Sequence, residues 1–168
     1  MIRRLLLILS LLFQVFSLLS AQDVKQHSVA LIPYPVTLVE GEGAFVFSEK
    51  TVVALEDNEL EPIARDFVEL FTEPAGFTPK LKVKSKKGEV YLMKDDSFQE
   101  EGYALEVTPE KIVVKAAGVK GAFYALQTLR QLLPSDIEGN ECKPDVIWKV
   151  PSVRITDEPR FGYRGLMV

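Results

Sequence analysis

The chain has 168 residues, with 20 basic and 24 acidic side chains, a net charge of −4 and 47% hydrophobic residues. The acidic balance argues against a nucleic-acid or anionic-membrane partner, and the length suits one domain with its own core. The one cysteine, Cys142, excludes an internal disulfide, and with the one histidine, His27, it cannot form a zinc site of the usual kind.

The first 21 residues predict a secretory signal peptide. Two arginines precede a mostly apolar run over 5–19, and Ser20-Ala21 offers small residues for cleavage. The run is short for a membrane span, which needs roughly 20 apolar residues. We therefore expect export to the periplasm or the extracellular space, and no stable membrane span. Without this segment 18 basic side chains (20 minus 2) face 24 acidic ones, so the net charge becomes −6.

A polar lead-in over 22–30 comes next. The motif Ile32-Pro33-Tyr34-Pro35 excludes a helix, because proline fixes φ and restricts the residue before it. The pattern that follows predicts a β-hairpin, with strands over 36–39 and 44–47 joined by a turn at Gly41-Glu42-Gly43.

A third strand over 51–55 precedes a helix predicted from about Glu59 to Thr72. Asp57-Asn58 supplies its N-terminal cap, and Pro74-Ala75-Gly76 ends it. Apolar residues at helical spacing form one core-facing stripe: Leu60, Ile63, Ala64, Phe67, Leu70 and Phe71.

Lysines alternate with apolar residues over 80–84, which predicts a strand with one wet face. Its lysines suit the edge of a sheet, where they discourage further strand pairing. Another strand is predicted over 89–93. Strands over 102–107 and 111–115 form a second hairpin through Thr108-Pro109-Glu110.

A second helix is predicted over 118–133, before a polar loop over 135–145. Its apolar face comprises Val119, Ala122, Phe123, Leu126, Leu129 and Leu133. Extended structure resumes over 150–155, and 161–168 has the pattern of the beginning of a buried strand. The elements together predict an α+β fold, a mixed or mostly antiparallel sheet with two helices packed on one face.

The sequence offers little catalytic chemistry of its own. Adjacent acid pairs occur at Asp95-Asp96, Glu100-Glu101 and Asp157-Glu158, all in predicted turns or linkers, and neighbours on a strand point to opposite faces. A Ser-His-Asp triad would have to use His27 in the polar lead-in. Gly118-Val119-Lys120-Gly121 lacks the spacing of phosphate-binding loops. We expect no metal and no cofactor.

Four segments carry a resemblance to a known family. The stretches 101–107 and 116–134 resemble the non-catalytic N-terminal domain of family 20 glycoside hydrolases, and 32–35 is similar to the opening of that domain. The stretch 153–165 is similar to the passage into the family's (β/α)8 barrel. The similarity covers about residues 30–168, and its motifs occur in the family's order.

The resemblance implies a fold and an activity. The family's enzymes are β-N-acetylhexosaminidases, which remove terminal non-reducing N-acetylhexosamine with retention, the substrate's own acetamido group acting as the nucleophile. An Asp-Glu pair in the barrel does this work; Asp157-Glu158 does not match its position. Arg164 matches the family's arginine on the first barrel strand, which hydrogen-bonds sugar hydroxyls. A barrel needs about 250 residues, so the catalytic groups are not expected in this chain.

The resulting division is a signal peptide over 1–21, a lead-in over 22–30, a non-catalytic α+β domain over 31–150, and a linker with the truncated start of a barrel over 151–168. The chain is then expected to be inactive alone and to pack against its own barrel in a longer protein. The alternative is a stand-alone carbohydrate-binding or scaffold module. Such a module would stack sugars on exposed aromatic residues, for which the candidates are Tyr34, Tyr91, Tyr103 and Trp148.

Overall fold

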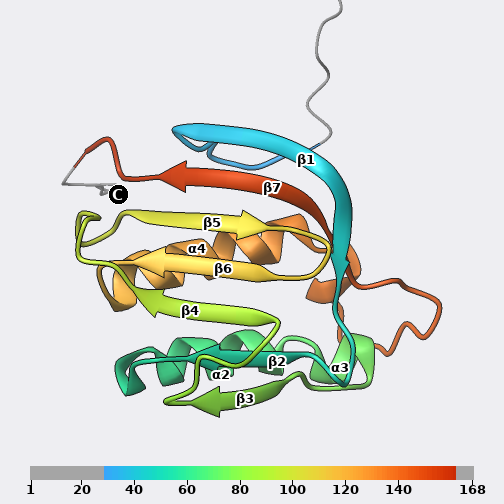
Figure 1. The fold of residues 1–168 in the computed structure, drawn as a ribbon. Helices are drawn as coiled ribbons and strands as arrows, with labels where there is room; N and C mark the ends of the chain where they lie inside the picture. Colours follow the sequence, from blue (N-terminus) through green and yellow to red (C-terminus); the bar gives the residue numbers. More distant parts are fainter. Residues whose placement is uncertain (1–28, 162–168) are drawn as a thin grey trace, which may run out of the picture.

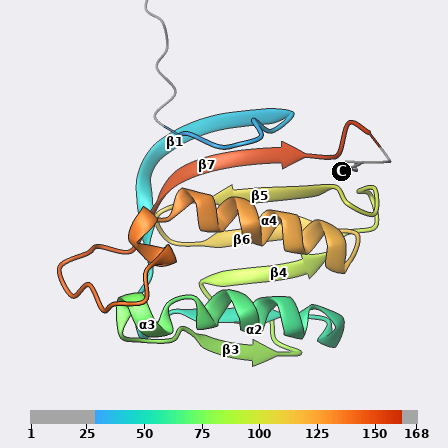
Figure 2. The same cartoon turned by 180° about the vertical axis from the view of Figure 1, so that it is seen from behind.

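The computed structural model describes residues 29–161. Seven strands form one sheet in the order β1-β7-β5-β6-β4-β2-β3, and the helices lie on one side of it (Figures 1 and 2). This arrangement confirms the predicted α+β fold. The strands are β1 (Thr37–Val46), β2 (Val52–Leu55), β3 (Lys80–Val83), β4 (Val90–Lys94), β5 (Tyr103–Val107), β6 (Ile112–Ala116) and β7 (Lys149–Asp157).

The helices are shorter than the sequence pattern predicts. The expected helix over 59–72 is divided into a 3-10 turn η1 (Asn58–Leu60), α2 (Glu61–Glu69) and a short α3 (Thr72–Ala75), which ends at Gly76 with φ of 69°. Asp57 caps η1 as expected, since its carboxylate accepts the Glu59 amide at 2.9 Å. The second long helix is α4 (Val119–Leu132), and the polar loop after it begins with a 3-10 turn, η2 (Ser135–Glu138).

The sheet has an antiparallel half and a parallel half. β1 with β7, β7 with β5, and β5 with β6 are antiparallel, whereas β6, β4, β2 and β3 run parallel to one another. The predicted hairpin over 102–115 is confirmed as β5–β6. β3 lies at the edge of the sheet, which confirms the edge position expected for its alternating lysines.

The predicted hairpin over 36–47 is wrong. β1 is one continuous strand, and it pairs with β7, with Thr37 opposite Thr156 and Val46 opposite Lys149. The Gly-Glu-Gly segment does not reverse the chain; it forms a bulge in which β1 advances from Glu40 to Ala44 while β7 retreats only from Val153 to Pro151. Glycine-rich segments of this kind occur in bulges as well as in turns. Here the strand that pairs with β1 is β7, which is distant in sequence, so the local pattern could not distinguish the two.

Each strand separates two faces by the ordinary alternation of side chains. The helix-covered face carries an in-register row across the whole sheet: Leu38, Ile155, Leu105, Val114, Leu92, Leu55 and Val83. The opposite face of the sheet is here called the open face. Its corresponding row is offset by one residue on each strand and consists of Val39, Arg154, Glu106, Val113, Tyr91, Ala54 and Lys82. Only the first row is wholly apolar, because α2 and α4 cover it.

The predicted apolar face of α4 is correct at its centre and wrong at two positions. Ala122, Leu126 and Leu129 are buried against the sheet, whereas Val119 and Phe123 are 38% and 43% exposed. The helix lies close to the sheet at Gly121, where an added Cβ would come within 2.3 Å of the Gly102 carbonyl oxygen. Because Gly121 faces the sheet, the rotation of α4 about its axis is fixed, and Val119 and Phe123 lie on the outer side of the helix.

A loop over 84–89 crosses the open face to connect β3 with β4. It passes over β2 (Figure 1), and a Cβ at Gly88 would lie 2.6 Å from the Val52 carbonyl oxygen and 2.9 Å from the Ala54 Cβ. Only glycine allows this approach. Ala54 is therefore fully buried although it belongs to the open-face row.

Two sequence predictions lie outside the described residues. These are the signal peptide over 1–21 and all but the first residue of the strand expected over 161–168. Between residues 29 and 161, no helix combines the length and the apolar character that crossing a bilayer requires.

Candidate functional site

The residues singled out from sequence do not form a common site. Arg164 and His27 lie outside the described residues. Asp157 ends β7, where its carboxylate accepts the Val36 amide at 3.0 Å and fixes the entry of the chain into the sheet. Of the aromatic residues, Tyr91, Tyr103 and Trp148 are buried, and Tyr34 is 52% exposed.

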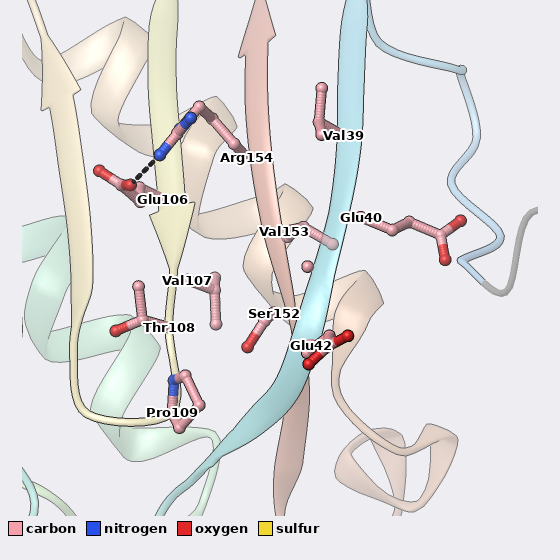
Figure 3. Close-up of a pocket in the computed structure, with 11 residues that line it drawn as sticks. Val39, Glu40, Glu42, Glu106, Val107, Thr108, Pro109, Ser152, Val153 and Arg154 are labelled. Carbon is pink, nitrogen blue, oxygen red and sulfur yellow. Dashed lines mark hydrogen bonds and ion pairs between the residues drawn. The ribbon is translucent and has the colours of Figure 1, made fainter.

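A cleft on the open face is the feature that sequence reasoning missed. It encloses about 330 Å3 between the bulge of β1, the middle of β7 and the turn that follows β5 (Figure 3). Its lining residues are Val39, Glu40, Gly41, Glu42, Glu106, Val107, Thr108, Pro109, Ser152, Val153 and Arg154. The three segments come from positions 39–42, 106–109 and 152–154, so only the sheet brings them together.

The glycines of the bulge determine the shape of the cleft. Gly43 has φ of 84°, in the left-handed region that favours glycine, and its added Cβ would lie 2.8 Å from the Pro109 ring. At Gly41 a Cβ would approach the Ser152 Cβ to 3.3 Å. The bulge therefore lies directly over Ser152 and against the β5–β6 turn.

Ser152 lies at the base of this cleft, and its buried hydroxyl is unsatisfied within residues 29–161. The residue is 4% exposed, and its hydroxyl has no hydrogen-bond partner among the described residues. Figure 3 shows the hydroxyl directed into the space beside Val107 and Pro109. A buried hydroxyl without a partner costs about 1–3 kcal/mol, so the position is less stable than the same position with an apolar residue.

An ion pair forms one wall. Arg154 donates to the Glu106 carboxylate at 2.6 Å across β7 and β5, and this hydrogen bond raises the pKa of the guanidinium above its usual value. Glu42 stands near Ser152 on the other side, while Glu40 is directed away from the cleft (Figure 3). Within the cleft, carboxylates thus outnumber cations.

This arrangement suits binding rather than bond cleavage. Glu106 is engaged by Arg154, and among the described residues no base is hydrogen-bonded to the Ser152 hydroxyl to activate it as a nucleophile. Over residues 29–161, no three side chains of His, Cys, Asp or Glu converge as metal ligands. The groups in the cleft can exchange hydrogen bonds with a small polar molecule and contact its apolar parts through Val39, Val107 and Pro109.

A second surface surrounds the point where the chain leaves the sheet. Glu100 pairs with Lys120 of α4 at 2.8 Å beside Val36, Glu158 and Arg160. The lead-in runs along α4, since the Ile32 amide donates to the Gln131 side chain at 3.1 Å. The large apolar residues exposed on the lead-in, on α4 and at the exit are Ile32, Tyr34, Val36, Val119, Phe123 and Phe161. These residues are here called the exit surface.

Comparison with known proteins gives a consistent result. The family described as "Glycosyl hydrolase family 20, domain 2" matches residues 28–158. A "Beta-hexosaminidase" of Porphyromonas gingivalis is 32% identical over 146 residues, covering 83% of this chain and 18% of the relative. A "Beta-N-acetylhexosaminidase" of Cellulomonas fimi is 28% identical, covering 83% of this chain and 28% of the relative.

Solved structures show the same relationship. The Streptomyces plicatus N-acetyl-beta-hexosaminidase in complex with Thio-NAglucal has a TM-score of 0.74 and 26% identity, over 80% of this chain and 27% of that one. A beta-N-acetylhexosaminidase from Bacteroides fragilis has a TM-score of 0.58 and 28% identity, over 77% of this chain and 25% of that one. The chain therefore spans well under a third of the length of each of these proteins.

Proposed function

Because the chain belongs to glycosyl hydrolase family 20 and corresponds to domain 2 of that family, we propose that it is the non-catalytic front part of an exported β-N-acetylhexosaminidase. In the full-length enzyme, terminal non-reducing N-acetylhexosamine would be released by a retaining, substrate-assisted reaction. The observation that supports this most directly is the family match over 28–158, which contains the whole described sheet and both long helices.

The acid pairs of this chain support the assignment of catalysis to another part of the enzyme. Asp95 accepts hydrogen bonds from the Ser97 amide and hydroxyl, and these bonds lower the pKa of its carboxyl. Glu100 pairs with Lys120, and Asp157 accepts the Val36 amide. Each of these carboxylates serves the local structure. The 168 residues are proposed to hydrolyse no glycoside by themselves.

The rest of the enzyme is proposed to pack on the exit surface. Six large apolar residues are exposed there, along a surface that runs from Ile32, which is bonded to Gln131 near the end of α4, to the exit of the chain after Asp157. Exposed apolar residues that gather in one region mark an interaction surface more often than scattered ones do. The helices α2 and α4 would then lie between the sheet and the barrel. The boundary expected from sequence between 150 and 151 falls inside β7, so we propose that the domain extends to Asp157.

Two further parts of the proposal concern residues outside the described range. Residues 1–21 are proposed to direct export to the periplasm or the extracellular space, as the charge and hydropathy of that segment indicate. Arg164 is proposed to hydrogen-bond sugar hydroxyls in the complete barrel, because the guanidinium fork supplies several fixed donors. Both segments lie outside residues 28–158, which the family match covers.

The test compares two proteins on an aryl β-N-acetylglucosaminide. One is the 168-residue chain, and the other extends it through the DNA that follows the Val168 codon. We expect no hydrolysis by the first and hydrolysis by the second, with Arg164→Ala reducing kcat/KM of the second. Hydrolysis by the 168-residue chain would contradict the proposal, and so would a stop codon directly after Val168 in intact genomic DNA, which would favour a stand-alone module.

A further inference from the structure

We propose that the open-face cleft is a second sugar-binding site, in which the buried hydroxyl of Ser152 hydrogen-bonds one ring of an uncharged saccharide. The choice of a saccharide rests on the proposed function, whereas the existence of a site rests on the geometry of the cleft. The site would hold a glycan on the non-catalytic domain, on the face of the sheet opposite to the helices.

The first argument is the unsatisfied hydroxyl. Ser152 lies on a strand whose neighbouring buried residues, Val150 and Val153, are apolar. An alanine or valine would fill such a position without leaving a polar group unpaired. A sugar hydroxyl donates and accepts at the same time, so it can satisfy a serine hydroxyl in either orientation. A bound ligand of this kind would therefore supply the partner that the domain does not.

The second argument is access. Gly41 carries no side chain at the place where a Cβ would meet Ser152, and Gly43 carries none at the place where a Cβ would meet the Pro109 ring. The space of about 330 Å3 lies at the lower end of the range for ligand sites, about 300–1,000 Å3. It therefore suits a single ring or a short oligosaccharide end. The bulge has few direct ladder contacts over 41–43, so a small movement there can open the way to the hydroxyl.

The third argument is charge and shape. The Arg154–Glu106 pair presents donors and acceptors side by side, as sugar hydroxyls require. Val39, Val107 and Pro109 offer apolar contacts for the C–H side of a ring. The carboxylates outnumber the single guanidinium, so a phosphorylated or carboxylated ligand would be repelled. An uncharged saccharide fits all three conditions.

The experiment measures amide chemical shifts of the full chain during titration with N-acetylglucosamine. We expect saturable shifts at Val39, Val107 and Ser152. N-acetylglucosamine 6-phosphate, which has the same ring and an added negative charge, should give none. Ser152→Ala should weaken N-acetylglucosamine binding about five- to tenfold, the loss expected for one hydrogen bond. Arg154→Gln should weaken it too, and Ser97→Ala, which is outside the cleft, should leave it unchanged.

Stability distinguishes a binding serine from a structural one. Because the Ser152 hydroxyl has no partner, Ser152→Ala should raise the urea midpoint while it weakens sugar binding. A serine that matters only for folding would lower the midpoint. The proposal is overturned if the phosphorylated sugar binds equally well, if Ser152→Ala leaves the affinity unchanged, or if no saturable shift occurs.

This outcome is separable from the outcome for the proposed function. Sugar binding is measured on the 168-residue chain, and glycoside hydrolysis is measured on the extended protein. If the 168-residue chain binds the sugar but the extended protein does not hydrolyse the glycoside, the binding site is supported and the hexosaminidase function is refuted. If the extended protein hydrolyses the glycoside but the 168-residue chain does not bind the sugar, the binding site is refuted and the hexosaminidase function is supported.

Discussion

The two faces of the sheet differ by one residue along each strand, and they have different tasks. The helix-covered row from Leu38 to Val83 is apolar on all seven strands, whereas the open-face row from Val39 to Lys82 mixes charged, aromatic and small residues. Stability therefore comes mainly from the covered face. The open face is free to carry the cleft, with its ion pair and its unsatisfied serine.

The open face is itself uneven. At the parallel end, the loop over 84–89 covers Ala54, and Lys111 lies over the Tyr91 ring at 5.2 Å. At the antiparallel end, the bulge of β1 leaves the cleft beside Ser152. On the open face, the loop over 84–89 therefore covers the parallel end, whereas the antiparallel end is left accessible at the cleft.

The largest difference between the faces is expected in the free energy of unfolding when two neighbouring residues of β5 are replaced in turn by alanine. Leu105 is fully buried on the covered face, so Leu105→Ala should lower the free energy of unfolding by about 2–5 kcal/mol, through lost burial and the cavity left behind. Glu106→Ala, one residue on, should change it far less. Urea denaturation of both variants tests this comparison, and similar losses would refute the division of tasks.

The contact between α4 and the sheet is the next effect in size. Gly121→Ala places a Cβ 2.3 Å from the Gly102 carbonyl oxygen, so the helix must move away from β5, at a cost of about 1–3 kcal/mol. Gly118→Ala, three residues earlier, meets no atom within 4 Å and provides the matched control. Thermal unfolding should show a clear loss for the first and a small one for the second. Equal melting temperatures would show that α4 tolerates displacement.

Alkaline pH should act on the covered face through Tyr103. Burial raises the pKa of its hydroxyl from 10.0 to about 12, the Asp157 carboxylate adds to the rise, and the hydrogen bond with Thr128 opposes it. Between pH 10 and 12 the unfolded chain releases this proton while the folded chain keeps it, so stability falls as pH rises, by roughly 1–3 kcal/mol.

Tyr103→Phe tests this pH dependence. The variant should be less stable at neutral pH, because it loses the hydrogen bond with Thr128, but it should show a shallower decline above pH 10. A residual decline is expected from Tyr91, whose pKa burial and the Glu56 carboxylate also raise to about 12. An unchanged decline in the variant would exclude Tyr103 as its source.

The smallest effect is expected at the ion pair of the open face. Arg154 is exposed and its partner Glu106 is half-exposed, so water and salt screen their attraction. Glu106→Gln should leave the urea midpoint within experimental error. A clear loss that disappears at high salt would show that the open face contributes to stability after all.

Sequence patterns predicted the local parts of this fold and missed the distant ones. The β5–β6 hairpin, the centre of α4 and the edge position of β3 each follow from residues within one short stretch. The pairing of β1 with β7 does not, because Gly41-Glu42-Gly43 has the composition of a turn and its true partner begins more than a hundred positions later. The exposure of Phe123 likewise depends on how closely Gly121 approaches β5.

The cleft was unpredictable for the same reason. Ser152 within an apolar strand and the glycines at 41 and 43 are each visible in the sequence, but only the β1–β7 register places them together. Pro109 joins them through the β5–β6 turn. Arg164, the one site residue taken from the family resemblance, lies outside the described residues and stays a prediction.

The pairing of β1 with β7 also imposes an order on biosynthesis. Within residues 29–161, the strand that leaves the ribosome first pairs with the strand that leaves last, and Thr37 is bonded to Thr156. Until β7 emerges, β1 has no ladder and β5 is an unprotected edge. Contacts of such long sequence separation slow folding and prolong exposure to aggregation. A nascent chain of this domain therefore needs protection until almost its last strand has been made.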